Sequence, residues 1–330
     1  MRKSMCVRVL VLGSVLALAI VGQQVRPPIQ PPAWAFQIPD KIHPPDEERS
    51  GPIQIPGSSK TFTADEIDDL SNPPDWFPEE HGTVPAIVQH GSEGVPACGS
   101  CHLMSGHGHP ESADLAGLPV EYLVRQMADF KSGARKDLVR MSDIGMAISS
   151  TDARQAAEWF ASLKPSAWVK VVETEAVPKS YVTLKGRMRF AWPGTATAPI
   201  GKRIIELPED PARAMSRDPH SGFIAYVPKG SIAKGEALVK TGGSGKTIAC
   251  GICHGDSLEG IGDVPRLAGL HPTYIVRQLL YFYEGGAYTG TSAALMKTVV
   301  PKLTVDDMIA IAAYAASLSP NLPDSPAHQQ

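Results

Sequence analysis

Apolar positions follow helical periodicity in two parts of the chain that lie about 150 residues apart. Amphipathic helices are predicted at 151–163 and 304–318 because each begins with a capping Ser or Thr and acidic residues in its first turn. A proline follows each of them, and proline cannot continue a helix. Shorter helices are predicted at 84–90 and 233–240. The pattern therefore predicts two similar helical units.

The segment between these units has a different pattern. Runs of β-branched and aromatic residues between Gly and Pro predict short strands. They lie at 169–172, 187–192, 202–207 and 222–227. We expect a β-containing segment over 165–231, as a small module or as a strap over the helical units. Residues 36–80, rich in Pro and acidic side chains, predict an extended leader with little core of its own.

The first residues have the pattern of a secretory signal. Basic residues precede an apolar run at 7–21, and no acidic residue occurs before Asp40. The run is shorter than the roughly 20 residues that a membrane-spanning helix needs. An Ala-Trp-Ala tripeptide at 33–35 matches a cleavage site, which makes 1–35 the expected signal peptide and Phe36 the start of the mature chain. An uncleaved membrane anchor is the alternative.

The charge of the chain argues against nucleic acid as a partner. The sequence has 31 basic and 34 acidic residues, and removal of the signal leaves 27 basic and 34 acidic, a net charge of −7. Nucleic-acid binding needs a basic surface, which this balance does not predict. An acidic surface favours protein partners that carry basic patches.

The cysteines carry the strongest chemical signal. One of five falls in the predicted signal, and the other four form two C-x-x-C pairs that are each followed by His: Cys98, Cys101 and His102, then Cys250, Cys253 and His254. C-x-x-C-H is the attachment site of c-type haem, because two thiols on one helical turn can reach the vinyl groups of one porphyrin edge. Zinc would need four ligands per site, and two disulfides or a thioredoxin-like pair would leave the His without a role. We therefore expect two covalently bound haem c groups.

An internal repeat surrounds both motifs. Leu-Ala-Gly-Leu at 115–118 recurs at 267–270, and Tyr-x-x-x-Gln at 122–126 recurs at 274–278, with the same offset of 152 as the cysteines. The repeat predicts two tandem domains. The expected units are 81–164 and 232–320, followed by a tail at 321–330.

A sixth iron ligand is expected in the loop before each terminal helix. Met141 and Met296 both lie 22 residues before the last Leu of that helix. A thioether favours ferrous iron and raises the reduction potential relative to a second histidine. In the first half Met146 remains an alternative to Met141. Met104 is too close to His102 to reach the opposite haem face.

With these motifs, the chain resembles the dihaem class I cytochromes c of the cytochrome c4 type. The resemblance covers 85–164 and 232–320. It implies a mainly α fold with two tandem class I cytochrome c domains, here with an intervening β-containing segment. It also implies a role for ten residues: Cys98, Cys101, Cys250 and Cys253 as thioether links, His102 and His254 as proximal ligands, Met141 and Met296 as distal ligands, and Arg125 and Arg277 near the haem propionates.

One detail of the resemblance differs between the two halves, and one leaves an alternative open. Family members carry a proline whose carbonyl accepts the proximal imidazole N–H. Pro265 matches this proline, whereas Ala113 stands at the matching position of the first half. For Arg125 and Arg277, a solvated helix face is the alternative to a contact with propionates.

Two weaker signals are discounted. The run Gly-Gly-Ser-Gly-Lys-Thr at 242–247 imitates a phosphate-binding loop but lacks the required first glycine, which favours a flexible loop. His107 and His109 lie in a Gly-rich loop, where solvent-exposed side chains are the simpler expectation than a metal site.

These features predict a periplasmic electron-transfer protein, acting as a carrier or as the cytochrome subunit of a respiratory or dehydrogenase complex. The expected partners are redox proteins, namely a dehydrogenase, a bc1-type complex or a terminal oxidase, and any membrane association is expected through them. The alternative is a dihaem cytochrome c peroxidase-type enzyme. Such an enzyme needs one iron with an open position and an acid/base group beside it, which two matched methionines argue against.

Overall fold

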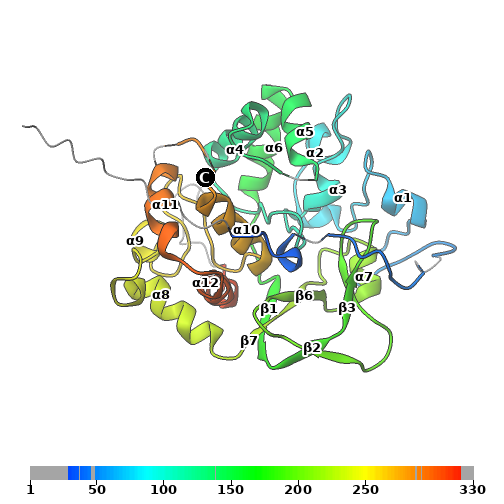
Figure 1. Cartoon of the computed structure of the whole chain (residues 1–330). Helices are drawn as coiled ribbons and strands as arrows, with labels where there is room; N and C mark the ends of the chain where they lie inside the picture. The colour runs from blue at the N-terminus through cyan, green and yellow to red at the C-terminus, as the bar shows by residue number, and fades with distance from the viewer. Residues whose placement is uncertain are drawn as a thin grey trace, which may run out of the picture.

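The apolar faces of the predicted helices form two separate hydrophobic cores, one in each half of the chain. The predicted terminal helices are confirmed as α6 (Ser150–Ser162) and α12 (Val305–Ser317), within one residue at each end. Figure 1 shows the two helical halves side by side, with the strands packed against them. The structure, a computed structural model, describes residues 29–320 except 37, 46–48, 138, 287 and 291.

The first half is a helical domain in which α4 packs against α5 and α6, while α2 packs against α6. Its core contains Ile87, Val88, Leu123, Trp159 and Phe160. Its helices, with α6 as the last, are α2 (Ala86–Gln89), α3 (Gly99–His102), α4 (Val120–Ser132) and α5 (Met141–Ala147).

The second half repeats this helix order around a more apolar core. α12 buries every residue from Asp307 to Ala316, and both α8 and α10 pack against it. The helices before α12 are α8 (Ser231–Gly245), α9 (Gly251–His254), α10 (Pro272–Tyr283), α11 (Ala293–Val299) and the 3₁₀ turn η3 (Val300–Lys302).

The glycine-rich run 242–247 ends α8 and turns the chain toward α12. Gly242, Gly243 and Ser244 have φ of +67°, +59° and +58°, which is the left-handed region that favours glycine. Lys246 then forms an ion pair with Asp307 at the start of α12. The run is therefore a helix-terminating turn whose lysine already has a carboxylate partner.

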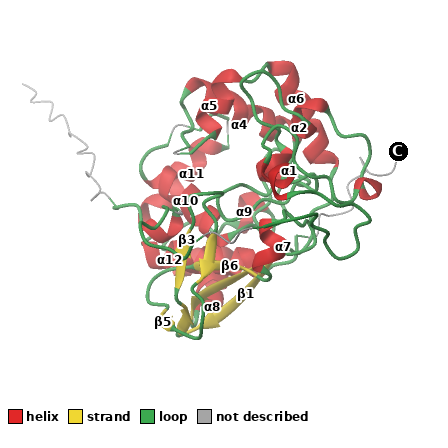
Figure 2. Ribbon diagram, turned by 90° about the vertical axis from the view of Figure 1, so that its right-hand side faces the viewer, coloured by secondary structure: helices red, strands yellow, loops and turns green. Residues whose placement is uncertain are grey.

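The β-containing segment is confirmed, and its main sheet shares the core of the second domain. The sheet has the order β1-β7-β6, with β1 parallel and β6 antiparallel to β7. Val227 of β7 and Ile204 belong to the core cluster of α8, α10 and α12. Figure 2 shows the strands gathered on one side of the helices. The segment is therefore not a separate module.

Four of the strands match the predicted runs, and three short ones were not predicted. The matching strands are β1 (Val169–Thr174), β4 (Arg189–Ala191), β6 (Ile205–Pro208) and β7 (Phe223–Pro228). The others are β2 (Ala176–Pro178), β3 (Ser180–Val182) and β5 (Thr197–Pro199), which form the two-stranded pairs β2–β5 and β3–β4. A short helix, α7 (Pro211–Met215), precedes β7.

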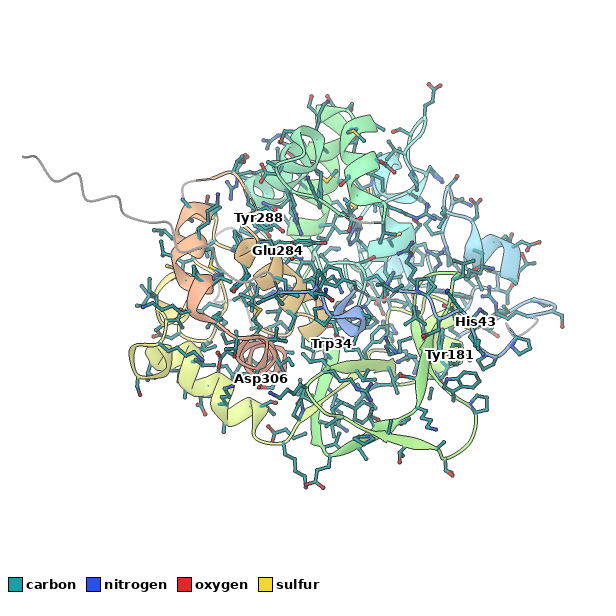
Figure 3. The ribbon with its side chains drawn as sticks, in the orientation of Figure 1. Trp34, His43, Tyr181, Glu284, Tyr288 and Asp306 are labelled. Atoms are coloured by element: carbon teal, nitrogen blue, oxygen red, sulfur yellow. The ribbon has the colours of Figure 1, made fainter. Side chains whose placement is uncertain are left out.

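The prediction of an extended leader over 36–80 was wrong for its second part. Ile55, Ile67, Trp76 and Phe77 form a small hydrophobic cluster, although they are too widely spaced in the sequence to give a periodic pattern. The leader contains α1 (Ala64–Asp68) and the 3₁₀ turn η2 (Pro78–Glu80). Its earlier part also contacts the β-containing segment, since His43 stacks on Tyr181 (Figure 3).

The predicted cleavage site lies in a packed segment. Ala33–Ala35 form the 3₁₀ turn η1 against α10, Ala35 is fully buried, and its carbonyl accepts a hydrogen bond of 2.6 Å from Arg277. The apolar run of the predicted signal lies outside the described residues. Among the helices that are described, none is both long enough and apolar enough to cross a membrane.

Asp307 is expected to contribute to stability in a pH-dependent way. Its carboxylate caps α12 through Thr304 N at 2.9 Å and also pairs with Lys234 at 2.9 Å and with Lys246. Burial raises the pKa of this carboxyl, but the hydrogen bonds outweigh burial, and the net pKa lies well below its usual value. The stabilisation is therefore complete above about pH 4 and is lost as pH falls below that unfolded-state value.

We expect Asp307→Asn to lower the free energy of unfolding by about 1–3 kcal/mol at pH 7, and by less as the pH falls below 4. Urea denaturation at both pH values measures the difference. The matched control is Asp306→Asn, because the Asp306 side chain is 44% exposed and its ion pair is with the exposed Lys202. A control loss as large as that of the Asp307 variant would contradict the assignment.

Candidate functional site

The first C-x-x-C-H motif forms a single helical turn, α3. The Cys98 carbonyl accepts from the His102 amide at 3.0 Å, which closes the turn and places both cysteines and the histidine close together. His102 is buried, and its ring meets Phe160 edge to face at 6.0 Å. The second motif forms the same turn, with 3.0 Å between the His254 amide and the Cys250 carbonyl. The local geometry of the two motifs is therefore the same.

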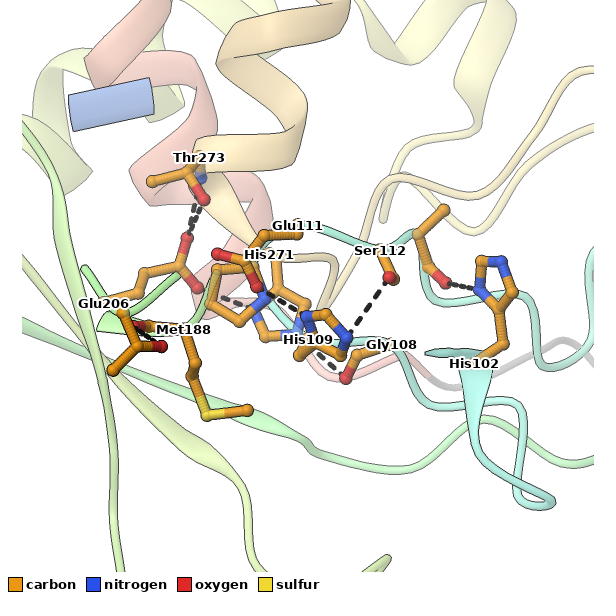
Figure 4. Close-up of polar contacts among 12 residues, drawn as sticks. His102, Gly108, His109, Glu111, Ser112, Met188, Glu206, His271 and Thr273 are labelled. Atoms are coloured by element: carbon orange, nitrogen blue, oxygen red, sulfur yellow. Dashed lines mark hydrogen bonds and ion pairs between the residues drawn. The ribbon is translucent and has the colours of Figure 1, made fainter. Parts of the chain in front are cut away.

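Both histidines are held in the same tautomer by a backbone carbonyl. Nδ1 of His102 lies 2.7 Å from the Ala113 carbonyl (Figure 4), and Nδ1 of His254 lies 2.9 Å from the Pro265 carbonyl. A carbonyl only accepts, so Nδ1 carries the proton and Nε2 keeps the lone pair that a metal needs. Because the acceptor is a backbone atom, Ala113 serves as well as the expected proline.

Burial keeps both imidazoles neutral. It lowers the pKa of His102 to about 4, against a smaller opposing effect of the hydrogen bond to Ala113, and it also lowers the pKa of His254. A neutral imidazole is the form that binds iron.

None of the four cysteines of the motifs forms a disulfide. Burial raises the pKa of Cys98 to about 12 and that of Cys250 to about 11. A thiol–disulfide exchange pair needs the opposite shift, because its thiolate is the reactive form. The unpaired cysteines therefore argue against two structural disulfides, and the raised pKa values argue against a thioredoxin-like pair.

A cavity of about 1390 Å³ adjoins the first motif. Its walls include Cys98, Cys101, His102 and Met141, together with Met188 and other residues of the β-containing segment. This volume exceeds the roughly 300–1,000 Å³ that is usual for small ligands. Two thiols, a neutral imidazole and a thioether around one large cavity fit a covalently attached haem. Of the two methionines weighed for this half, Met141 lines the cavity, whereas Met146 is 59% exposed.

Asp137 fixes the backbone at Met141. Its Oδ1 accepts from the amides of Val139, Arg140 and Met141 at 3.0, 2.6 and 2.9 Å. Met141 is the first residue of α5, and the other two amides lie just before it. None of the three has a partner within the helix, so the carboxylate satisfies them and interacts favourably with the helix dipole.

In the second half, two residues of the predicted site pack against the same hydrophobic core. Cys250 and Met296 both pack against the hydrophobic cluster that contains Leu258, Leu279 and Val300. Met296 lies on α11, which contacts α10. These residues offer the same set of donor atoms as the first half.

The two domains meet through a pseudo-twofold interface. Arg266 pairs with Asp114, the residue at the same repeat position, and the side chains of both are 1% exposed. Arg125 pairs with Asp263 at 3.2 Å, and its counterpart Arg277 donates to the carbonyl of Glu111, the counterpart of Asp263. Reciprocal contacts of this kind are what a twofold arrangement of two copies produces.

Arg125 and Arg277 therefore join the two domains. Neither of the roles considered from the sequence, a propionate contact or a solvated helix face, includes this contact. Arg277 is buried beside the cavity and donates to the carbonyls of Ala35 and Pro110, both at 2.6 Å. Arg125 is three-quarters buried against the other domain. A solvated helix face is wrong for both, and the propionate contact remains a prediction.

Sequence reasoning missed Arg135. Its guanidinium donates to Gln126 at 2.8 Å, to Tyr274 at 3.1 Å and to Gln278 at 3.0 Å, so it links the two Tyr-x-x-x-Gln motifs. The repeat could not reveal it, because the offset of 152 leads from Arg135 to an alanine.

Sequence reasoning also missed a buried network near the first motif. Glu206 of β6 accepts from Thr273 N at 2.8 Å and contacts His271 Nδ1 at 2.6 Å, and all three residues are buried (Figure 4). Burial raises the pKa of Glu206, but His271 and Thr273 outweigh it, so the net pKa is lowered. This carboxylate belongs to the β-containing segment and caps the N-terminus of α10 in the second domain.

The expectation of solvent-exposed histidines after the first motif was wrong. His107 is buried and stacks on Trp168 at 4.6 Å, while His109 is partly buried and contacts Glu111 at 2.5 Å. The described residues contain no group of three or more His, Cys, Asp or Glu side chains that could hold a metal ion.

Comparison with known proteins agrees with this geometry. The cytochrome c family model matches residues 232–319. Cytochrome c4 of Pseudomonas aeruginosa is 27% identical over 69% of this chain and 87% of that protein. The chain is a cytochrome c4-like class I cytochrome c. As a cytochrome c, it binds haem covalently and transfers electrons.

Two further proteins are similar to this cytochrome. The thiosulfate dehydrogenase electron acceptor of Thiomonas intermedia is 28% identical over 70% of this chain and 84% of that protein. The solved structure of cytochrome c4 from Acidithiobacillus ferrooxidans is 23% identical, with a TM-score of 0.46, over 67% of this chain and 98% of that chain.

Removal of the Asp137 carboxylate is expected to loosen the start of α5. Asp137→Ala leaves three amides without their acceptor, so we expect a loss of about 1–2 kcal/mol and faster amide hydrogen exchange at residues 139–141. Exchange monitored by mass spectrometry measures the effect. Asp143→Ala is the control, because this exposed carboxylate lies in the same helix and accepts no hydrogen bond among the described residues. Equal exchange in both variants would be the contrary result.

Proposed function

We propose that this cytochrome is a periplasmic dihaem electron-transfer protein. The observation that carries the proposal is the duplicated site. In each C-x-x-C-H turn, the histidine forms the same hydrogen bond to the backbone carbonyl of the residue eleven positions later. Each domain also supplies one methionine at the matching distance from its terminal helix. The thioether links are Cys98, Cys101, Cys250 and Cys253, and the axial ligands are His102 with Met141 and His254 with Met296.

The residues of the chain keep each site rigid during electron transfer. When bound, the haem iron supplies the one-electron couple. Ala113 and Pro265 hold the proximal imidazoles, and Asp137 holds the backbone of Met141. If a histidine and a methionine held each haem iron, neither iron would have the open position that a peroxidase needs. The dihaem peroxidase alternative is not supported.

The proposed partners are a dehydrogenase as electron donor and a bc1-type complex or terminal oxidase as acceptor. The similarity to a protein named as the electron acceptor of thiosulfate dehydrogenase supports a dehydrogenase as donor. The acidic balance of the sequence, 34 acidic against 31 basic residues, favours partners with basic docking surfaces.

The optical spectrum of the air-oxidised holoprotein tests this function. We expect a methionine-to-ferric charge-transfer band with the intensity of two haems and no high-spin band. Met141→Ala should remove half of that intensity, because one thioether ligand is lost, and Met146→Ala should leave it unchanged, because that side chain is exposed. A high-spin band in the unmodified protein, or loss of the band only in the Met146 variant, would overturn the ligand assignment.

A further inference from the structure

The two haem-attachment turns occupy equivalent positions but differ sharply in exposure. Ser100 lies between the cysteines of the first motif and is 5% exposed, whereas its counterpart Ile252 in the second motif is 70% exposed. The neighbouring residues follow the same trend: Ala97 is buried, and its counterpart Ala249 is partly exposed. The difference therefore lies in the residues before and between the cysteines, whereas the histidines of both motifs are equally buried.

The leader and the β-containing segment cover the first turn. The Ala97 amide donates to the Leu70 carbonyl of the leader at 2.9 Å, and the Arg217 side chain donates to the Ser100 carbonyl. Trp76 of the leader donates to Ser216 at 2.8 Å, which joins the two covering segments beside the motif. Arg217 also has a φ of +57°, a conformation that costs free energy in a residue other than glycine and persists only where its surroundings hold it.

The second turn has exposed apolar side chains and an exposed acidic neighbour. Ile248, Ile252 and Ile261 are three of the nine large hydrophobic side chains that are exposed among the described residues. Their counterparts in the first half are Pro96, Ser100 and His109, none of which is an exposed large hydrophobic residue. Asp256 is exposed beside them and forms no ion pair among the described residues. Exposed apolar residues beside polar or charged ones are typical of a protein-docking surface.

We infer that the second attachment turn is the docking surface for a redox protein with an apolar contact patch and a basic rim, and that the covering segments close the first turn to such partners. This inference rests on the proposed electron-transfer function. It adds that partners exchange electrons with this protein through the second domain. One electron crosses the surface in each encounter, and no bond is made or broken.

Electron exchange with a small, basic, single-haem cytochrome c tests the inference, measured by stopped flow on the holoprotein at low ionic strength. Ile252→Lys should lower the second-order rate constant about tenfold, because it removes the apolar contact and adds a like charge. Ile252→Ser, which copies the residue at the first turn, should lower it by a smaller factor. Reduction by dithionite and the optical spectrum should not change, which shows that both variants are folded and loaded with haem.

Ile42→Lys is the matched control, because Ile42 is 78% exposed on the leader, does not line the cavity of the first motif and receives the same charge. Its rate constant should stay within twofold of the unmodified value. An unchanged rate for both Ile252 variants, or an equal loss in the Ile42 variant, would overturn the docking surface while leaving the electron-transfer function intact. If the unmodified holoprotein exchanged no electrons with the reporter cytochrome, the proposed function itself would fail.

Discussion

The buried pair of Arg266 and Asp114 is the contact around which the two halves are arranged. Two charges removed from water are costly unless their remaining hydrogen-bonding groups are also satisfied. Arg266 meets this condition in part, since it also donates to the carbonyls of Ala268 at 2.5 Å and Ala116 at 3.2 Å. Ala268 and Ala116 belong to the two copies of Leu-Ala-Gly-Leu. The pair therefore fixes one repeat against the other at the pseudo-twofold axis.

The sheet of the β-containing segment is stable because it does not stand alone. Its three strands are short, and a sheet of this size needs a partner to cover its apolar face. The second domain supplies that partner through the core shared with Val227 and Ile204. Glu206 then connects the sheet to the start of α10. The segment also contacts the first domain, where the Trp168 indole N–H donates to the Gly108 carbonyl at 2.8 Å.

Local signals gave the helices and the haem motifs, whereas long-range contacts had to be observed. The terminal helices could be predicted because caps and periodicity lie within a few residues of each other, and C-x-x-C-H is a contiguous motif. The contacts of Arg217 with Ser100 and of Glu206 with His271 join residues 117 and 65 positions apart, and nothing in their neighbourhood indicates a partner. Ala113 shows a further limit, because any residue type can supply a backbone carbonyl.

The cover over the first attachment turn has a kinetic consequence for the protein. If only one turn is open, a donor and an acceptor compete for the same surface and cannot be bound together. Turnover then alternates between two binary complexes, and each partner must dissociate before the other can react. Such a protein gains little from very tight binding, since slow dissociation would limit its own flux. The two haem sites would act as a store that accepts two electrons before it changes partner, which distinguishes it from a fixed conductor between two enzymes.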